Sequence, residues 1–246
     1  GAAPRAVPDR RALLTAAGSR RQSASRARDY VVRHAMKVLL TNDDGIGAKG
    51  LQALRRALAA VPGIELAVIA PDSNRSATAR SITTRRPLSV QEIGFEDGTS
   101  GFATDGTPVD CVRFARLGLI DGFEADLVVA GINHGSNLGD DITYSGTVAA
   151  AIEGAFFGLN SVAVSLEFEE QAQFDRAATL ARRVIQQILA QKGPESRLYN
   201  VNIPTAALNR SSEVRIVPMG VHPYEEEFEK RVDPRGRAPA PARAFF

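Results

Sequence analysis

Short β-branched runs alternate with longer helical repeats from Met36 onward, and this alternation constrains the fold more than any other feature of the chain. It predicts parallel strands joined by helices. The predicted strands cover residues 37–41, 66–70, 127–130, 161–166, 198–203 and 214–218, and the predicted helices cover residues 51–61, 108–120, 147–159 and 174–189. Residues 88–103, split by Glu96-Asp97-Gly98, predict a β-hairpin. We therefore expect an α/β fold with a Rossmann-like, doubly wound, mostly parallel sheet, helices on both faces and a β-hairpin extension.

The composition indicates a globular protein of a reducing compartment. The 246 residues are 44% hydrophobic, which allows a sizeable core and excludes a fibrous or wholly disordered chain. The single cysteine, Cys111, cannot form an internal disulfide and is most simply a small buried group. No apolar run approaches the roughly 20 residues of a membrane-spanning helix. We expect a cytoplasmic protein with no membrane partner.

The charges are distributed unevenly along the chain. Residues 1–35 carry eight arginines against two acidic residues, whereas residues 36–246 carry four more acidic than basic residues. We expect residues 1–35 to be a disordered basic extension before a natural start at Met36. A transit peptide and a nucleic-acid-binding arm are the alternatives. Nucleic acid is an unfavourable partner, because the acidic remainder would repel phosphate groups beyond the arm.

Two polar loops follow the first two predicted strands, where the ligand crevice of such a sheet lies. The first contains the adjacent acids Asp43 and Asp44. Adjacent carboxylates repel each other unless a cation or hydrogen-bond donors compensate, so the pair is compatible with a divalent metal and also with an ordinary Asp-Gly turn. The second loop, Asp72 to Ser76, offers hydroxyl, amide and guanidinium groups suited to oxyanions and hard cations, or to a solvated loop.

A third, glycine-rich loop runs from Gly131 to Gly146 and leads into a helix that opens with Ser145-Gly146-Thr147. Free N–H groups and the positive end of the helix dipole at such a start form a ready phosphate site. The glycine spacing does not match the Gly-x-Gly-x-x-Gly dinucleotide motif, and no Gly-Lys-Ser/Thr of a P-loop occurs. A nucleoside triphosphatase of the common type is therefore disfavoured.

Taken together, the loops make residues 36 to about 237 similar to the stationary-phase survival protein family, SurE, whose members are metal-dependent 5'/3'-nucleotidases. Four signatures match in order: Leu39–Gly45, Ala70–Ser76, Gly106–Cys111 and Gly131–Glu153. The resemblance implies hydrolysis of nucleoside 5'-monophosphates, and also 3'-monophosphates, to nucleoside and phosphate. It also implies a homodimer or homotetramer.

The resemblance assigns roles to individual side chains. It implies one divalent cation, Mg²⁺ or Mn²⁺, held by oxygen ligands of Asp43, Asp44, Ser76 and Asn133. It implies a substrate phosphate surrounded by Asn137, Ser145, Gly146 and Thr147. Asp43 and Asp44 are the expected catalytic residues, with Asp43 as general base; a covalent aspartyl-phosphate at Asp43 is the less favoured variant. His134 is expected to be a wall residue.

Two features depart from the family pattern. Ala77 stands where the family commonly has glycine, which restricts the backbone beside Ser76. Residues 238–246 contain two prolines and no strand pattern where the family continues with further strands. We therefore expect a C-terminally incomplete nucleotidase domain at 36–237 and an aberrant tail at 238–246. A non-catalytic nucleotide-binding module is the alternative function, and base recognition is expected at residues 88–103 and near His222.

Overall fold

A computed structural model of the chain describes residues 35–190, 195–210 and 213–221. Its elements are β1 (Met36–Thr41), α2 (Lys49–Ala59), β2 (Ile64–Pro71), β3 (Val90–Gly94), β4 (Ser100–Thr104), α3 (Pro108–Arg116), β5 (Leu127–His134), η1 (Gly139–Thr143), α4 (Gly146–Phe156), β6 (Asn160–Leu166), α5 (Phe174–Ala190), β7 (Leu198–Ile203) and η2 (Thr205–Asn209). The predicted basic extension and C-terminal tail lie outside the described residues, as does the neighbourhood of His222.

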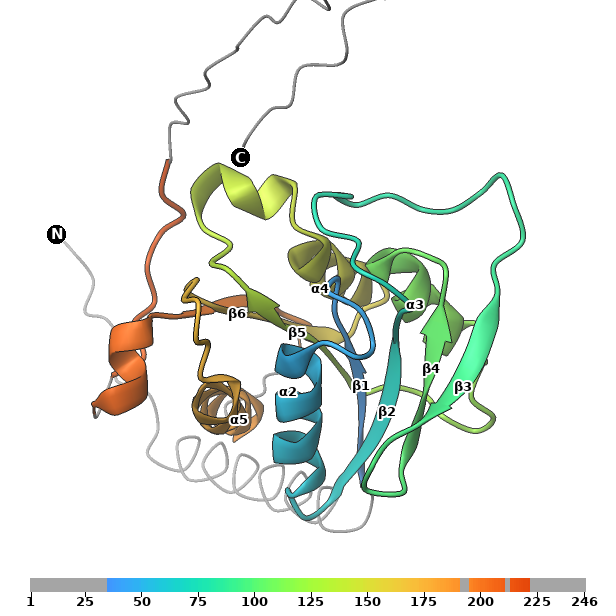
Figure 1. Cartoon of the computed structure of the whole chain (residues 1–246), viewed down its shortest axis with the longest axis horizontal. Helices are drawn as coiled ribbons and strands as arrows, with labels where there is room; N and C mark the ends of the chain where they lie inside the picture. Colours follow the sequence, from blue (N-terminus) through green and yellow to red (C-terminus); the bar gives the residue numbers. More distant parts are fainter. Residues whose placement is uncertain (1–34, 191–194, 211–212, 222–246) are drawn as a thin grey trace, which may run out of the picture.

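The strands form one seven-stranded sheet in the order β3-β4-β2-β1-β5-β6-β7 (Figure 1). Every neighbouring pair is parallel except β3 and β4, which form an antiparallel hairpin. The predicted fold class is confirmed. The predicted hairpin is also confirmed, and it joins the sheet because β4 pairs in parallel with β2.

Helices cover both faces of the sheet, as Figure 1 shows. Helices α2 and α5 pack together over one face, where apolar side chains from both helices and from the central strands form the larger core cluster. Helices α3 and α4 pack over the opposite face around Leu39, Ile69 and Val128. The central strands are buried on both faces, so they are continuous apolar runs instead of alternating ones.

The two halves of the sheet diverge at the boundary between β1 and β5. From β1 the chain crosses through α2 to β2 on one side, whereas β5 continues through α4 to β6 on the other side. Crevices for ligands in open α/β sheets lie beyond the carboxyl ends of the strands at such a switch point. The loops that begin at Asn42 and Gly135 are therefore expected to border the ligand site.

Three sequence-based boundaries differ from the structure. Strand β5 continues to His134, past the predicted end at Ala130. Helix α3 ends at Arg116 because Gly118, at φ +88°, takes the chain out of the helix before the predicted end at Ile120. Residues 214–218 were expected to form a strand, which is wrong: they are exposed and pair with no described strand.

A bilayer-spanning helix is absent from the part of the chain that the structure describes, since none of its helices is both long and apolar enough.

Candidate active site

The loop after β1 is a rigid turn built by Asn42. The buried Asn42 side chain accepts a hydrogen bond from the Gly45 N–H at 3.2 Å and donates one to the Gly45 carbonyl at 2.9 Å. Gly45 has φ +103°, and a Cβ there would lie 3.2 Å from the Ser73 backbone, so the position favours glycine. The turn places Asp43 and Asp44 directly beyond the carboxyl end of β1.

Asp43 lies against the start of α4. Its side chain is 3% exposed, and the Thr147 hydroxyl donates a hydrogen bond to Oδ1. Burial raises the pKa of the Asp43 carboxyl, and the Thr147 hydroxyl and the backbone N–H groups of Gly146 and Thr147 partly oppose that rise. A Cβ on Gly146 would lie 2.7 Å from the Asp43 Cβ, so only glycine permits this approach. The positive end of the α4 dipole thus faces the Asp43 carboxylate.

Asp44 is half-buried beside Asp43. The His134 backbone N–H and the Asn74 side-chain amide each lie 3.4 Å from one of its carboxylate oxygens. Burial and, secondly, the charge of Asp43 raise the pKa of the Asp44 carboxyl. For both carboxyls the effect of burial thus outweighs that of their hydrogen-bond donors.

Two of the four residues implied as metal ligands, Ser76 and Asn133, adjoin residues that bond to Asp43 and Asp44. The Arg75 N–H donates to the Asp43 carbonyl at 2.6 Å, which brings the adjoining Ser76 to the β1 loop. The His134 N–H approaches Asp44, which brings the adjoining Asn133 to the same place. The Asn133 amide nitrogen donates to the Gly135 carbonyl at 2.9 Å, a bond that does not use the amide oxygen.

This donor set fits a hard divalent cation. It consists of two carboxylates, a hydroxyl and an amide oxygen, the oxygen ligands that Mg²⁺ and Mn²⁺ prefer. Within the described residues, no group of three or more His, Cys, Asp and Glu side chains is placed to hold a metal ion. Zinc-type coordination is therefore not provided by this part of the chain, whereas two carboxylates of raised pKa would be neutralised by a bound cation.

The residues expected around the phosphate have partners within the protein. The Ser145 hydroxyl accepts a hydrogen bond from the Val148 N–H and caps α4, while the Thr147 hydroxyl is directed at Asp43. Asn137 is anchored to β6 and β7: its side-chain amide donates to Ser165 Oγ at 2.7 Å, and its backbone N–H donates to Asn202 Oδ1 at 2.8 Å. Their contact with phosphate remains a prediction.

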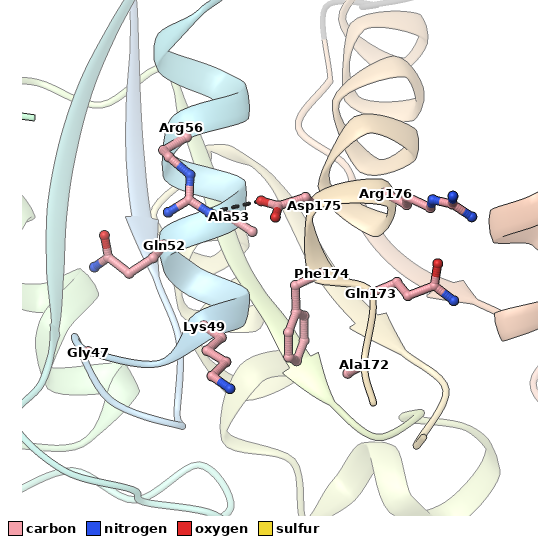
Figure 2. Close-up of a pocket in the computed structure, with 10 residues that line it drawn as sticks. All are labelled: Gly47, Lys49, Gln52, Ala53, Arg56, Ala172, Gln173, Phe174, Asp175 and Arg176. Atoms are coloured by element: carbon pink, nitrogen blue, oxygen red, sulfur yellow. Dashed lines mark hydrogen bonds and ion pairs between the residues drawn. The ribbon is translucent and has the colours of Figure 1, made fainter. Parts of the chain in front are cut away.

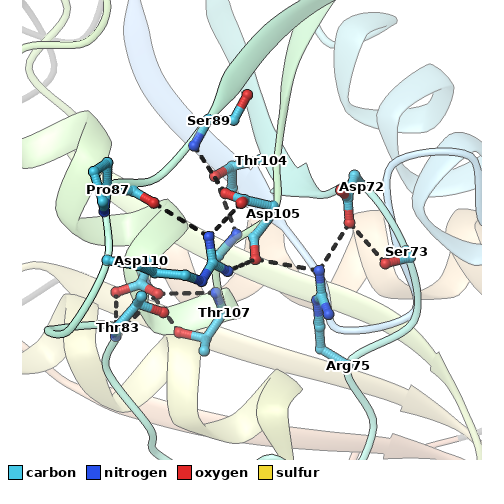
Figure 3. A network of polar contacts seen from close by, with 12 residues as sticks. Asp72, Ser73, Arg75, Thr83, Pro87, Ser89, Thr104, Asp105, Thr107 and Asp110 are labelled. Atoms are coloured by element: carbon cyan, nitrogen blue, oxygen red, sulfur yellow. Dashed lines mark hydrogen bonds and ion pairs between the residues drawn. The ribbon is translucent and has the colours of Figure 1, made fainter.

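The longer loop between β2 and β3 depends on charged contacts that the sequence did not reveal (Figure 3). Asp105 pairs with Arg86 and also accepts a hydrogen bond from the Ser89 N–H at 2.8 Å. The Arg75 guanidinium bridges Asp72 and the Asp105 carbonyl. The Ser89 N–H, as the largest cause, and Arg86 hold the pKa of Asp105 below its usual value.

The same loop also forms contacts with α4 and with the residue that precedes the α4 N-cap. The Ala79 N–H donates to the Tyr144 carbonyl at 3.1 Å, and Arg80 pairs at 2.6 Å with Glu153, which is 3% exposed on α4. Arg113 holds the other oxygen of Glu153 at 3.0 Å. Ala77 lies between the bonded residues Arg75 and Ala79 and has φ +57°. The position where glycine was expected therefore does require a left-handed backbone.

The sequence predicts structural roles for Cys111 and His134. Cys111 is fully buried, as predicted, and burial raises the pKa of its thiol. The ring of His134 stacks on Phe168 at 4.7 Å between centroids and meets the edge of Phe174 at 5.4 Å. Its Nε2 lies 3.0 Å from the Glu169 carbonyl, and its role as a wall residue of the site stays a prediction.

The fold and the carboxylate pair define an α/β protein with two adjacent acidic residues at the switch point of its sheet. The chain belongs to the Survival protein SurE family, whose model matches residues 38–226.

Relatives and a solved structure support this placement. The chain is 47% identical over 202 residues to the 5'-nucleotidase SurE of Rhodopirellula baltica, an alignment that covers 82% of this chain and 79% of the relative. It is 46% identical over 202 residues to the 5'-nucleotidase SurE of Syntrophomonas wolfei, covering 82% and 75%. The crystal structure of the SurE protein from Aquifex aeolicus superimposes with a TM-score of 0.72 at 36% identity, covering 85% of this chain and 82% of that one.

Proposed function

We propose that the chain is a nucleotidase that hydrolyses nucleoside 5'-monophosphates, and also 3'-monophosphates, with the help of one bound Mg²⁺ or Mn²⁺. The observation that carries the proposal is the placement of Asp43 between its neighbour Asp44 and the start of α4. In this proposal, the carboxylates that bind the cation and the start of α4 that binds the phosphate adjoin each other. The names of the relatives, 5'-nucleotidase SurE, agree with this chemistry.

The cation would be held by Asp43, Asp44, Ser76 and Asn133, and when bound it supplies charge neutralisation and a lowered pKa for a reacting water. Asn137 and the start of α4, residues Ser145 to Thr147, where the positive end of the helix dipole lies, orient the phosphoryl oxygens. Asp43 Oδ2, which the Thr147 hydroxyl does not occupy, accepts the proton of the attacking water. The phosphorus–oxygen bond to the ribose breaks, and solvent protonates the leaving ribose oxygen.

Phosphate release measures the proposal directly. Wild-type chain, Asp43→Asn and Asp44→Asn are incubated with 5'- and 3'-monophosphates and Mn²⁺, Mg²⁺ or a chelator. Glu65→Gln is a matched control, because Glu65 is exposed at the amino end of β2, on the opposite edge of the sheet. We expect metal-dependent release from the wild type and the control, lost in both aspartate variants.

The same samples distinguish the rival function. A folded wild-type chain that binds nucleotides but releases no phosphate under any metal would replace the nucleotidase by a non-catalytic binding module. A phosphorylated enzyme trapped by acid quench would assign Asp43 the covalent role instead of the general-base role.

The remaining parts of the proposal concern extent and assembly. We place the nucleotidase domain at residues 36–237, with a homodimer or homotetramer in the cytoplasm. The single cysteine fits a reducing compartment. Limited proteolysis followed by mass spectrometry, and light scattering of the intact chain, measure the domain limits and the oligomeric state.

A further inference from the structure

An exposed aromatic ring is connected to the carboxylate pair through His134. Phe168, in the loop between β6 and α5, is 66% exposed. One face of its ring lies against His134, with an interplanar angle of 20°, and Phe174 meets the same histidine edge-on at 74°. The His134 backbone N–H points at Asp44. A flat apolar surface is thus presented to solvent a short distance from the proposed reaction centre.

The loop that carries Phe168 is held on both sides of the ring. On one side, Glu167 accepts hydrogen bonds from the Thr205 N–H at 2.8 Å and from the Thr205 hydroxyl at 3.0 Å. On the other side, the Glu169 carbonyl contacts His134 Nε2 at 3.0 Å. The ring is therefore preorganised, and little conformational entropy would be lost when a ligand stacks on it.

Phe174 extends the aromatic surface toward α2. Its ring packs against the Gly50 backbone and lines a cavity of about 510 Å³ between the starts of α2 and α5. Figure 2 shows the ring lying between Lys49 and Ala172, beneath the ion pair of Arg56 with Asp175. The whole surface begins at the carboxyl ends of β5 and β6, on the side of the switch point opposite the hairpin.

We propose that the exposed face of Phe168, backed by His134, is the stacking surface for the base of the nucleotide substrate. This inference rests on the proposed nucleotidase function. Bases stack on aromatic rings with little sequence preference, because every base has a π-face. The site would therefore accept purines and pyrimidines, with purines favoured by their larger area. It lies apart from the hairpin region, residues 88–103, where the sequence suggested base recognition.

Tyr144 is the competing candidate. It is 61% exposed and directly precedes the α4 start, but its ring stacks on no other ring among the described residues. A ring without a backing partner loses more freedom on binding a base than a ring that is already held. The structure therefore favours Phe168.

The test compares a substrate with a base and one without. Hydrolysis of AMP and of ribose 5-phosphate with Mn²⁺ is measured for the wild type, Phe168→Leu, Phe168→Trp and Tyr144→Leu. We expect Phe168→Leu to lose about tenfold in kcat/KM for AMP, mainly through KM, with ribose 5-phosphate unchanged. Phe168→Trp should retain or improve AMP hydrolysis, and Tyr144→Leu should keep the wild-type ratio of the two substrates.

The possible outcomes distinguish a failure of the stacking role from a failure of the proposed nucleotidase function. An unchanged AMP-to-ribose 5-phosphate ratio in Phe168→Leu, or a loss of that ratio in Tyr144→Leu alone, would overturn the stacking role while leaving the nucleotidase intact. Equal losses on both substrates would make Phe168 a structural residue and also overturn the inference. No release from either substrate by the folded wild type would overturn the proposed function itself.

Discussion

The two loops that bring together the carboxylates and Ser76 are built in different ways. The β1 loop is short and buried, and its shape follows from the side-chain amide of Asn42 and from Gly45. The β2 loop is long and mostly exposed, and besides the Arg75 N–H bond to Asp43 it is held to the rest of the molecule by charged contacts of its arginines. The carboxylates are therefore fixed by the packed fold, whereas the loop around Ser76 depends in part on contacts that salt and single surface substitutions can weaken.

The largest effect should come from the buried loop. Asp43→Asn removes a proposed metal ligand and the proton acceptor together, while the Thr147 hydroxyl can still donate to the amide oxygen. We expect kcat for AMP to fall by about 10³-fold or more at saturating Mn²⁺, with an unchanged circular dichroism spectrum. Undiminished hydrolysis by this variant would remove Asp43 from the mechanism.

A steric change at the same point should have the next largest effect. A Cβ in Gly146→Ala would meet the Asp43 Cβ at 2.7 Å, and this contact forces the carboxylate or α4 to move. Displacements on the ångström scale can reduce a rate by about 10²-fold, and we expect kcat to fall by that order. Gly47→Ala is the matched control, since its added Cβ meets nothing within 4 Å and should leave kcat unchanged.

The exposed loop should respond more weakly and in a different property. Arg80→Gln removes the link between the β2 loop and Glu153, and Arg113 still pairs with that carboxylate. We expect Mn²⁺ to bind about three- to tenfold more weakly by isothermal titration calorimetry, with higher salt reducing the difference from the wild type. Arg113→Gln breaks the other half of the same ion pair without touching the loop, so equal weakening in both variants would refute the proposed positioning.

The carboxylate pair should also lower the stability of the folded protein when no metal is bound. The pKa of Asp44 is raised by burial and by Asp43, so its protonation stabilises the folded state; that stabilisation is present at low pH and is lost as pH rises through the raised pKa. In a chelator, Asp44→Asn should therefore melt at a higher temperature than the wild type at pH 7, and the difference should shrink toward pH 3. Added Mn²⁺ should raise the melting temperature of the wild type alone.

The smallest expected effect concerns backbone strain. Ala77 has φ +57°, a conformation that glycine adopts without the steric cost of a Cβ. Ala77→Gly should leave the free energy of unfolding unchanged or raise it by up to about 1 kcal/mol. Ala57→Gly, in the interior of α2, should lower that free energy by about 1 kcal/mol in the same denaturant titration. A loss of equal size in both variants would show that Ala77 is unstrained.

Local patterns predicted the sheet because each central strand is a separate apolar run between turn residues. They also predicted that Asp43, Asp44 and the start of α4 share one edge, since the carboxyl ends of parallel strands meet there. The contact between Asp43 and Thr147 could not be predicted, because it joins residues 104 positions apart and depends on the register of β1 with β5. The apolar run at residues 214–218 misled the prediction, because a strand needs a partner that local sequence does not specify.

The contact between Thr147 and Asp43 links the site to the folding of the whole sheet. Asp43 follows β1 early in the chain, but its orienting donors come from α4, which packs against β5, the strand paired with β1. A partly folded chain that retains the amino-terminal half alone would possess the acidic residues without their alignment. Catalytic activity should consequently appear last during refolding and vanish with the first opening of α4, ahead of the loss of bulk secondary structure.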